Sequence, residues 1–276
     1  MRLKYIVVVF SVSLPTVYSQ GLTNSEPIGL AKVILADSAY SKMATFTNEH
    51  FRLHYEPHSL AGKHLDELSH QAEAARTLAL MLLGEQDFRP VLDLFYIHSR
   101  RQMKEIIGVE AKGWTDYRSK TIVLVYNDST RAYHNHEMMH AVVLNLWGFP
   151  ADSNHCFIEG AAVYADNPCL GEQIHEIAAY LFYERELIAF RKMFTAFRKQ
   201  KDMQSYMEAG SIVQYILETY GRDKFKALWQ RGIGRSREIL GRSFEEIEKD
   251  YIQFLRMKYP LKPEVPWPVL LAKGCG

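Results

Sequence analysis

The sequence has no excess of either charge, few cysteines and no repeats. Its 276 residues carry 33 Lys and Arg against 32 Asp and Glu. This balance gives no long-range field that would attract nucleic acid or an acidic membrane surface, so neither is an expected partner. Hydrophobic residues make up 47% of the chain, as is usual for globular proteins. The composition therefore predicts an ordinary folded protein with enough apolar material for a core.

Long hydrophobic runs are missing too, apart from a short one at the N-terminus. Arg2 and Lys4 precede an apolar run over residues 5–14, and Pro15 and small polar residues follow. This order is typical of a secretory signal peptide, and the run is short for a membrane span. We predict cleavage after Ser19, giving a secreted or periplasmic protein without stable membrane insertion. A membrane tether formed by an uncleaved signal is the alternative.

The three cysteines lack the close spacing of a C-x-x-C metal site. Export permits a disulfide bond. Cys156 and Cys169 are the closest pair in sequence, so they are the first candidates for a bridge. Cys169 with Cys275 is a competing pairing, and three unpaired thiols are a third alternative. Any single bridge leaves one cysteine free.

Hydrophobic periodicity predicts strands first and helices afterwards. Strands are predicted at 51–55, 91–97 and 121–126, with helices at 64–83 and 102–107. Beyond residue 130 the pattern is almost wholly helical, and the predicted helices cover residues 130–147, 156–165, 171–199, 205–219, 222–231 and 243–258. This order indicates an α+β fold rather than a parallel α/β fold.

The predicted organisation has four parts. The signal peptide takes residues 1–19, and an N-terminal arm of mixed composition takes residues 20–47. One folded domain covers residues 48–258. Several prolines within residues 259–276 predict an extended C-terminal tail.

The segment from His136 to His140, His-Glu-Met-Met-His, carries the most specific chemistry of the chain. Its two histidines are four residues apart, so on a helix they project from one face and can bind one cation. Glu137 follows His136 and can serve as a general base without being a ligand. The apolar residues around the motif predict the helix that this interpretation requires. If only the two histidines are considered, the alternative is a surface or core helix in which they bond to other groups and bind no metal.

A third ligand separates a catalytic zinc site from a chance pair of histidines. Catalytic zinc takes three protein ligands and keeps its fourth position open. Glu159 lies on the next predicted helix, after a turn that contains glycine and proline. Two antiparallel helices would bring the three side chains to one point, and Gly160 permits their close approach. We therefore predict one Zn²⁺ ion bound by His136, His140 and Glu159.

The His-Glu-x-x-His motif followed by Glu159 and Gly160 resembles the gluzincin metallopeptidases, the clan of thermolysin and the zinc aminopeptidases. The nearer likeness is to the small peptidase MA-like domains. It covers about residues 50–255 and includes the turn at Gly113 before the strand at 121–126. The resemblance implies a zincin-like fold, with a sheet-bearing N-terminal lobe, a helical C-terminal lobe and a cleft between them.

The resemblance also implies a zinc-dependent peptidase with Glu137 as its general base and a peptide or protein as its substrate. Gluzincins stabilise the oxyanion with a Tyr or His on a helix that follows the third ligand. By that likeness Tyr206 is the candidate, and a half-buried structural tyrosine is the alternative. His175, Tyr180 and Tyr183 are weaker competitors.

The chain departs from the family pattern near the third ligand. Thermolysin-like enzymes carry an Asp four residues after that ligand, where this chain has Val163. Asp166 and Asn135 are the candidates for orienting a ligand instead. The G-x-M-E-N signature of aminopeptidases is absent, which favours an endopeptidase. The strand at 121–126 is the candidate for pairing with an extended peptide.

Two further histidines lie near the motif in sequence but are not predicted as ligands. On a helix His134 points away from His136, because two residues turn through roughly 200°. His155 lies four residues before Glu159 and is expected to precede its helix.

Two other functions fit the same residues. One is a zinc-binding or adhesion module that kept the fold without catalysis; Glu137 argues against it, because a structural site does not need that acid. The other is a zinc hydrolase of a non-peptide substrate such as an ester.

Overall fold

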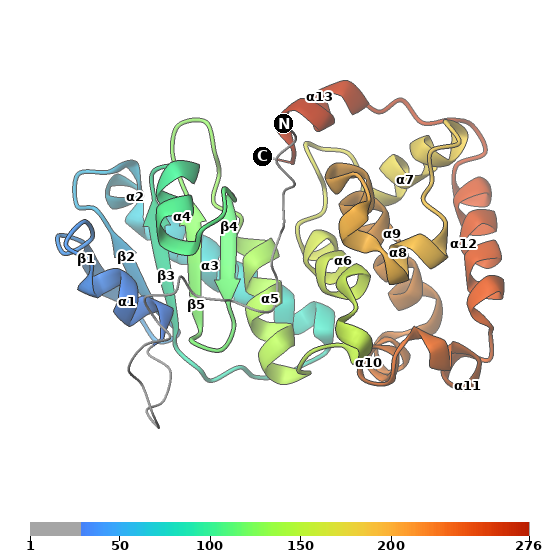
Figure 1. Cartoon of the computed structure of the whole chain (residues 1–276), viewed down its shortest axis with the longest axis horizontal. Helices are drawn as coiled ribbons and strands as arrows, with labels where there is room; N and C mark the ends of the chain where they lie inside the picture. The colour runs from blue at the N-terminus through green and yellow to red at the C-terminus, as the bar shows by residue number, and fades with distance from the viewer. Residues whose placement is uncertain (1–28, 276) are drawn as a thin grey trace.

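The structure is a computed structural model that describes residues 29–275. The predicted signal peptide and its cleavage point lie outside these residues. Within the described range, every helix is too short or too polar to cross a membrane. Figure 1 shows a sheet-bearing part formed by the first half of the chain and a helical part formed by the second half.

The elements follow the predicted order. In the sheet-bearing part they are α1 (Leu30–Ala36), β1 (Ala44–Thr47), β2 (Phe51–Tyr55), α2 (Leu60–Lys63), α3 (Leu65–Leu83), β3 (Leu92–Ile97), α4 (Arg100–Ile107), β4 (Gly113–Asp116), β5 (Thr121–Val125) and α5 (His134–Leu146). The helical part contains η2 (Ala151–Ser153), α6 (His155–Ala165), α7 (Ile174–Tyr183), α8 (Phe190–Thr195), η3 (Phe197–Lys199), α9 (Asp202–Tyr220), α10 (Arg222–Arg231), η4 (Ile233–Arg235), α11 (Ser236–Leu240), α12 (Phe244–Lys258) and α13 (Trp267–Lys273). The α+β fold class is confirmed.

The five strands form one mixed sheet in the order β1-β2-β3-β5-β4. β2, β3 and β5 are parallel neighbours, and β1 and β4 pair antiparallel at the two edges. Every residue of β3 and β5 is buried, as expected of central strands with nearly continuous apolar sequences. The strand next to α5 at the edge of the sheet is β4 (Figure 1).

The prediction that the strand at 121–126 receives an extended peptide is wrong. This strand is β5, and β3 and β4 occupy its two sides. Gly113, predicted to lie in a turn, is instead the first residue of β4. β4 has only four residues, and all of them are half-buried. The strand is too short to show the alternation of apolar and polar side chains from which a strand is predicted.

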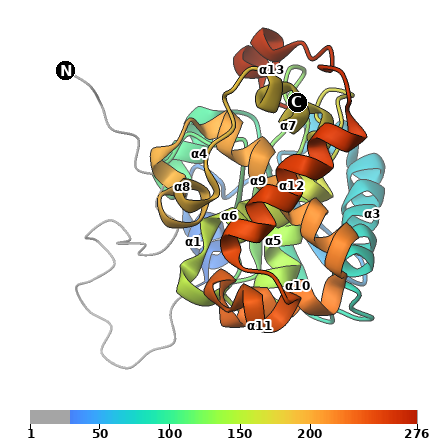
Figure 2. The same cartoon turned by 90° about the vertical axis from the view of Figure 1, so that its right-hand side faces the viewer.

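Helices cover both faces of the sheet. Alternate residues of the central strands, such as Leu94 and Leu124, enter the main core with α3 and α5. The residues between them, such as Phe95 and Val123, pack with α1 and α4 in a second cluster. Figure 2 shows α3 on one side of the molecule and α1 and α4 on the other. Helix α5 is thereby held between the sheet and the helical part.

The predicted helix at 171–199 is wrong, because the chain breaks there into α7, α8 and η3. Arg185, just after α7, adopts a left-handed conformation with φ of 60°. The break is stabilised from another helix, since the buried Glu208 carboxyl on α9 accepts the backbone N–H of Ile188 at 2.9 Å. A hydrophobic pattern cannot reveal a hydrogen bond of this range.

Burial also makes Glu208 sensitive to pH. It raises the Glu208 pKa to about 8, against the opposing hydrogen bonds from Ile188 and Gln204. Because the unfolded carboxyl titrates near its ordinary value of about 4.5, the contribution of this group to stability is fully present below that pH and is lost as the pH rises through about 8. Between pH 5 and pH 8.5 the free energy of unfolding of the wild type should fall by several kcal/mol because of this group. We expect Glu208→Gln to remove that fall, as measured by urea unfolding at both pH values. Equal pH dependence of variant and wild type would contradict this.

The N-terminal arm and the C-terminal tail contain more structure than predicted. Within the described residues of the arm, α1 and β1 form. The tail is not extended throughout, because α13 forms there and buries Trp267 and Leu270 against Ile174 and Ile177. The isolated pattern of a short helix among prolines is too weak to predict it.

The favoured pairing of Cys156 with Cys169 is wrong, and the competing pairing is found. Cys169 and Cys275 form a disulfide, with their Cα atoms 4.6 Å apart. Cys156 is a buried free thiol inside α6. The tail folds back over the helical part, which brings Cys275 to a residue far from it in sequence. Such a bond is typical of an oxidising compartment.

Helices α6 and α9 pack closely in the middle of the helical part. A Cβ atom at Gly160 would lie 2.5 Å from the backbone oxygen of Ala209, and one at Gly210 would lie 2.6 Å from Val163. The close approach at Gly160 therefore involves α9 and not, as predicted, the helix that carries His136 and His140. This contact fixes the position of the residues on either side of it, Glu159 on α6 and Tyr206 on α9.

Candidate metal centre

Helix α5 presents the two histidines of the motif on one face. His136 Nε2 and His140 Nε2 lie 3.2 Å apart. Both side chains are largely buried, with 16% and 12% of their surface exposed. The apolar residues between and after them, Met138, Met139 and Val142, face the core and hold the helix in place. The helical spacing that the motif requires is therefore present.

Helix α6 brings Glu159 to the same point. Asn154 caps its first turn by accepting the Phe157 N–H at 3.3 Å, which begins the helix directly after the turn from α5. Glu159 Oε2 lies 3.6 Å from His136 Nε2 and 3.4 Å from His140 Nε2. Two helices that follow one another in the chain thus supply three donor atoms.

The spacing of these three atoms fits a tetrahedral cation. Bonds of about 2.0–2.1 Å to a tetrahedral centre place ligand atoms about 3.3–3.4 Å apart. The three observed distances, 3.2, 3.6 and 3.4 Å, lie around that value. The group of His136, His140 and Glu159 could therefore hold a metal ion, and it leaves the fourth corner of the tetrahedron without a ligand from this group.

The charges in the cluster also suit a cation. Burial alone would lower the pKa of His136, but the Glu159 carboxylate and the negative charge of Glu137 outweigh it and raise the pKa to about 9. For Glu159, burial raises the pKa, and the two histidines more than reverse this and hold it well below its usual range. The buried site therefore combines an ionised carboxylate with surroundings that stabilise positive charge.

Glu137 points toward the edge strand rather than joining the ligand group. Its Oε2 accepts the hydroxyl of Thr115 on β4 at 2.7 Å, and its backbone oxygen accepts the same hydroxyl at 3.0 Å. A Cβ atom at Gly113 would lie 2.4 Å from Glu137 Oε1, so only glycine leaves room for this carboxylate. The sequence gives no sign of Thr115, because β4 itself is not predictable from its pattern.

Asp166, one of the candidates for orienting a ligand, directly follows α6 and is within electrostatic range of His136 and Glu137. Burial raises its pKa to about 6, with the charge of Glu137 adding to this and that of His136 opposing it. Val163, at the position of the family's Asp, is buried against Gly210 instead.

Tyr206 lies on the side of the cluster formed by α9. Burial raises its pKa well above the ordinary value, and the negative charges of Glu159 and Glu137 raise it further. The phenol therefore keeps its proton near these carboxylates. Its three competitors are engaged elsewhere. His175 bonds to the Ser211 hydroxyl, Tyr180 lies under the Lys262 ammonium, and Tyr183 donates to the backbone oxygen of Tyr259.

The two rejected histidines stand outside the cluster, as predicted. His134 is buried and bonds through Nε2 to the Tyr96 hydroxyl at 2.8 Å, and burial lowers its pKa to about 4. His155 is the first residue of α6 rather than preceding it. Its Nε2 accepts a hydrogen bond from the guanidinium of Arg198. Arg198 was not predicted as a site residue from the sequence.

Comparison with known proteins adds no relative. No protein family matches the chain, and no curated protein is similar to it in sequence.

Proposed function

We propose that this chain is a zinc-dependent metallopeptidase of the gluzincin type, with a zincin-like fold, which hydrolyses internal peptide bonds of exported or extracellular substrates. One observation carries the proposal. Three donor atoms from His136, His140 and Glu159 have tetrahedral spacing, and Glu137 lies beside them without being a ligand. A purely structural site needs the first of these features and not the second.

The donor set favours zinc over other cations. Two imidazole nitrogens and one carboxylate oxygen are the ligands of many catalytic zinc sites, whereas magnesium and calcium take oxygen ligands. A zinc ion held by these three residues would supply Lewis-acid chemistry and would make a water molecule acidic enough to act as a nucleophile near neutral pH.

The chain's own residues supply the proton transfers. Glu137, oriented by the Thr115 hydroxyl, takes a proton from the attacking water and delivers it to the leaving amine. Tyr206 remains a neutral phenol, so it can donate a hydrogen bond to the oxyanion as the carbonyl becomes tetrahedral. Asp166, near His136, is positioned to hold the orientation of that ligand.

The edge strand supports a peptide as the substrate. β4 is the last strand of the sheet formed by the described residues, and its Thr115 contacts the general base. An edge strand offers backbone N–H and C=O groups to which an extended peptide can add as a further strand. A peptide on β4 would pass directly beside Glu137. An ester substrate gains nothing from this edge.

The proposal is tested by metal content and cleavage together. The purified protein is expected to contain one equivalent of zinc by mass spectrometry, and to cleave a mixed peptide library in a manner abolished by a chelator and restored by zinc. His136→Ala and Glu159→Ala should each lower zinc affinity by at least about tenfold, since each removes one ligand. His98→Ala, which removes an exposed histidine, is the matched control and should change neither zinc content nor cleavage.

Three results would contradict parts of the proposal. A protein that holds zinc and cleaves nothing would be a binding module. A protein that hydrolyses esters but no peptide would be a zinc hydrolase of another class. Unchanged zinc content in both ligand variants would show that the metal binds elsewhere.

A further inference from the structure

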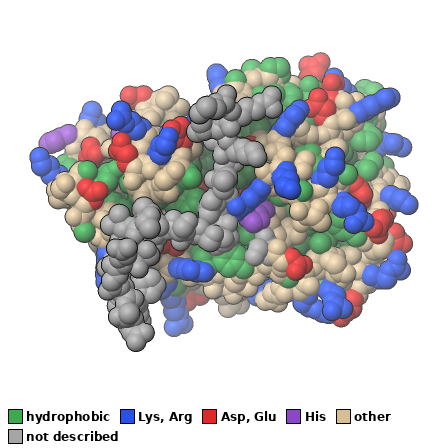
Figure 3. All heavy atoms as spheres, in the orientation of Figure 1, with side chains coloured by type: hydrophobic (Ala, Val, Ile, Leu, Met, Phe, Trp, Pro, Cys, Tyr) green, Lys and Arg blue, Asp and Glu red, His purple; other side chains and the backbone are tan. Residues whose placement is uncertain are grey.

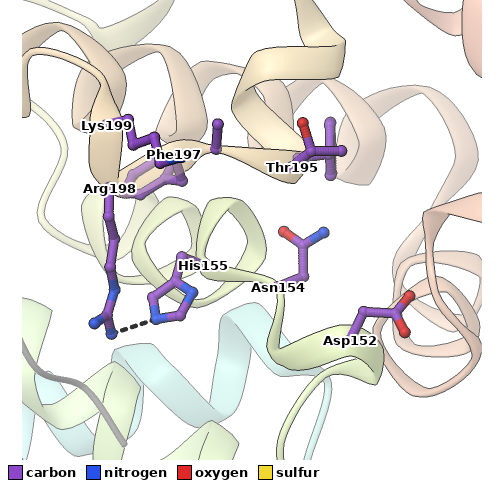
Figure 4. Close-up of a pocket in the computed structure, with 9 residues that line it drawn as sticks. Asp152, Asn154, His155, Thr195, Phe197, Arg198 and Lys199 are labelled. Atoms are coloured by element: carbon purple, nitrogen blue, oxygen red, sulfur yellow. Dashed lines mark hydrogen bonds between the residues drawn. The ribbon is translucent and has the colours of Figure 1, made fainter.

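A pocket of about 240 Å³ opens beside the metal cluster, between the start of α6 and the segment that joins α8 to η3 (Figure 4). One wall is formed by Asp152, Asn154 and His155, and the opposite wall by residues 194–199. The metal ligands and Glu137 do not line it. Its volume is enough for one side chain of a bound peptide.

Three residues that line this pocket, His155, Phe197 and Arg198, lie near Glu159 or Tyr206. His155 lies one helical turn before Glu159 on α6, so the two project from the same face. Arg198 bonds to His155 (Figure 4) and lies within electrostatic range of the Glu159 carboxylate. Phe197 packs on the ring of Tyr206, with ring centres 5.5 Å apart. A group in the pocket would therefore lie next to a bond held at the metal.

The wall of the pocket belongs to a strongly basic stretch of chain. Residues 191–201, here called the basic segment, contain five Lys and Arg and no Asp or Glu. All five are exposed, and Arg191 has an ion-pair partner in Glu245 at 3.8 Å. Figure 3 shows Lys and Arg side chains spread over this face of the helical part. The balance of charge on the whole protein hides this local excess.

The one acid in the pocket lies away from the basic end. Figure 4 places Asp152 at the opposite side of the pocket from Arg198. The pocket also lies at the N-terminal end of the eleven-residue helix α6, where the helix dipole favours negative charge. Both Arg198 and this helix end therefore favour an anionic group at the Arg198 end.

We propose that this pocket recognises an acidic group of the substrate next to the cleaved bond, with Arg198 as its anchor. The inference rests on the proposed peptidase function and names its substrate class: peptides with Asp or Glu beside the scissile bond, or with a free terminal carboxylate at that position. A guanidinium carries five N–H donors in a fixed plane, so it can hold His155 and a carboxylate at once. The two aromatic side chains of the wall, Phe194 and Phe197, would contact the aliphatic part of the bound residue.

The test measures binding separately from cleavage. The zinc-loaded Glu137→Gln variant is titrated into two pools of fluorescent hexapeptides that are identical except that Glu in one pool replaces Gln in the other. A third pool has the Gln sequence with a free C-terminal carboxylate, and the first two are amidated. We expect the Glu pool to bind about tenfold more tightly than the Gln pool, as a charge-assisted hydrogen bond gives.

Two substitutions in the same background identify the anchor. Arg198→Gln should remove the difference between the Glu and Gln pools, and Arg198→Glu should reverse it, so that the Gln pool binds more tightly than the Glu pool. Lys192→Gln is the matched control, because Lys192 is an exposed member of the basic segment that does not line the pocket, and it should leave the tenfold difference intact. A preference for the third pool over the Glu pool would assign the pocket to a terminal carboxylate.

Equal binding of the Glu and Gln pools without a preference for the free carboxylate would overturn the inference, and so would a preference that survives Arg198→Gln. Peptide cleavage by the wild-type protein tests the proposed peptidase function independently of this binding experiment. If the wild-type protein binds the Glu pool through Arg198 but hydrolyses nothing, the inference about the pocket stands and the proposed peptidase activity is wrong.

Discussion

Glu137→Gln is expected to lower kcat for peptide cleavage by at least about a hundredfold while the protein keeps its zinc. Glutamine has the shape of glutamate, and its amide oxygen can still accept the Thr115 hydroxyl that lies 2.7 Å from Glu137 Oε2. It cannot accept a proton from water, and general-base catalysis contributes roughly 10²–10⁴ to such rates. The measurement is kcat on the best peptide of the library, together with zinc content.

A matched control separates the lost base from a general disturbance. Glu67→Gln changes an exposed glutamate on α3 that accepts a hydrogen bond from Gln71, one helical turn away, at 2.9 Å, and should leave kcat unchanged. Thr115→Val tests the orientation of the base and should produce a smaller loss than Glu137→Gln. If the Glu137→Gln variant kept more than a tenth of the wild-type kcat, another residue would have to be the base.

Removing the disulfide should produce the largest change in stability. Cys169 and Cys275 are 106 residues apart in sequence, and closing a loop of that length restricts the unfolded chain by about 4–5 kcal/mol in the chain-entropy description. The double variant Cys169→Ser and Cys275→Ser is therefore expected to lose several kcal/mol in free energy of unfolding. Urea unfolding at constant pH measures it.

The reducing agent supplies the control for this prediction. Dithiothreitol should lower the urea midpoint of the wild type to that of the double variant and leave the double variant unchanged. Cys156 is buried and free in both proteins, so it contributes equally. A wild-type midpoint that does not respond to reductant, under conditions where the thiols are shown to be reduced, would mean that the bond does not stabilise the fold.

The parts of the site that sequence predicts are those fixed by local geometry. His136 and His140 meet because four residues make about one helical turn, and Glu159 joins them because a short turn reverses the chain between two helices. Helix α3 was predictable for the same reason, since its apolar period ends at Gly84, whose φ is 70°. None of these features depends on a partner far away in the chain.

The features that escaped prediction depend on distant partners. β4 exists through its pairing with β5, and the Glu208 carboxyl on another helix holds the loop after α7. The choice of Cys275 over Cys156 as the partner of Cys169 follows from the path of the tail. The pocket at Arg198 requires α6 and η3 to lie side by side. Local pattern contains no signal for any of these.

The glycine contact between α6 and α9 has a consequence for how the molecule can move. At Gly160 and Gly210 the two helices pack too closely to admit a Cβ atom, so we expect them to move together as one rigid unit. Glu159 and Tyr206 belong to that unit, whereas His136 and His140 belong to α5 on the sheet-bearing part. A cation bound by all three ligands would link α5 to this unit and so restrict any separation of α5 from α6.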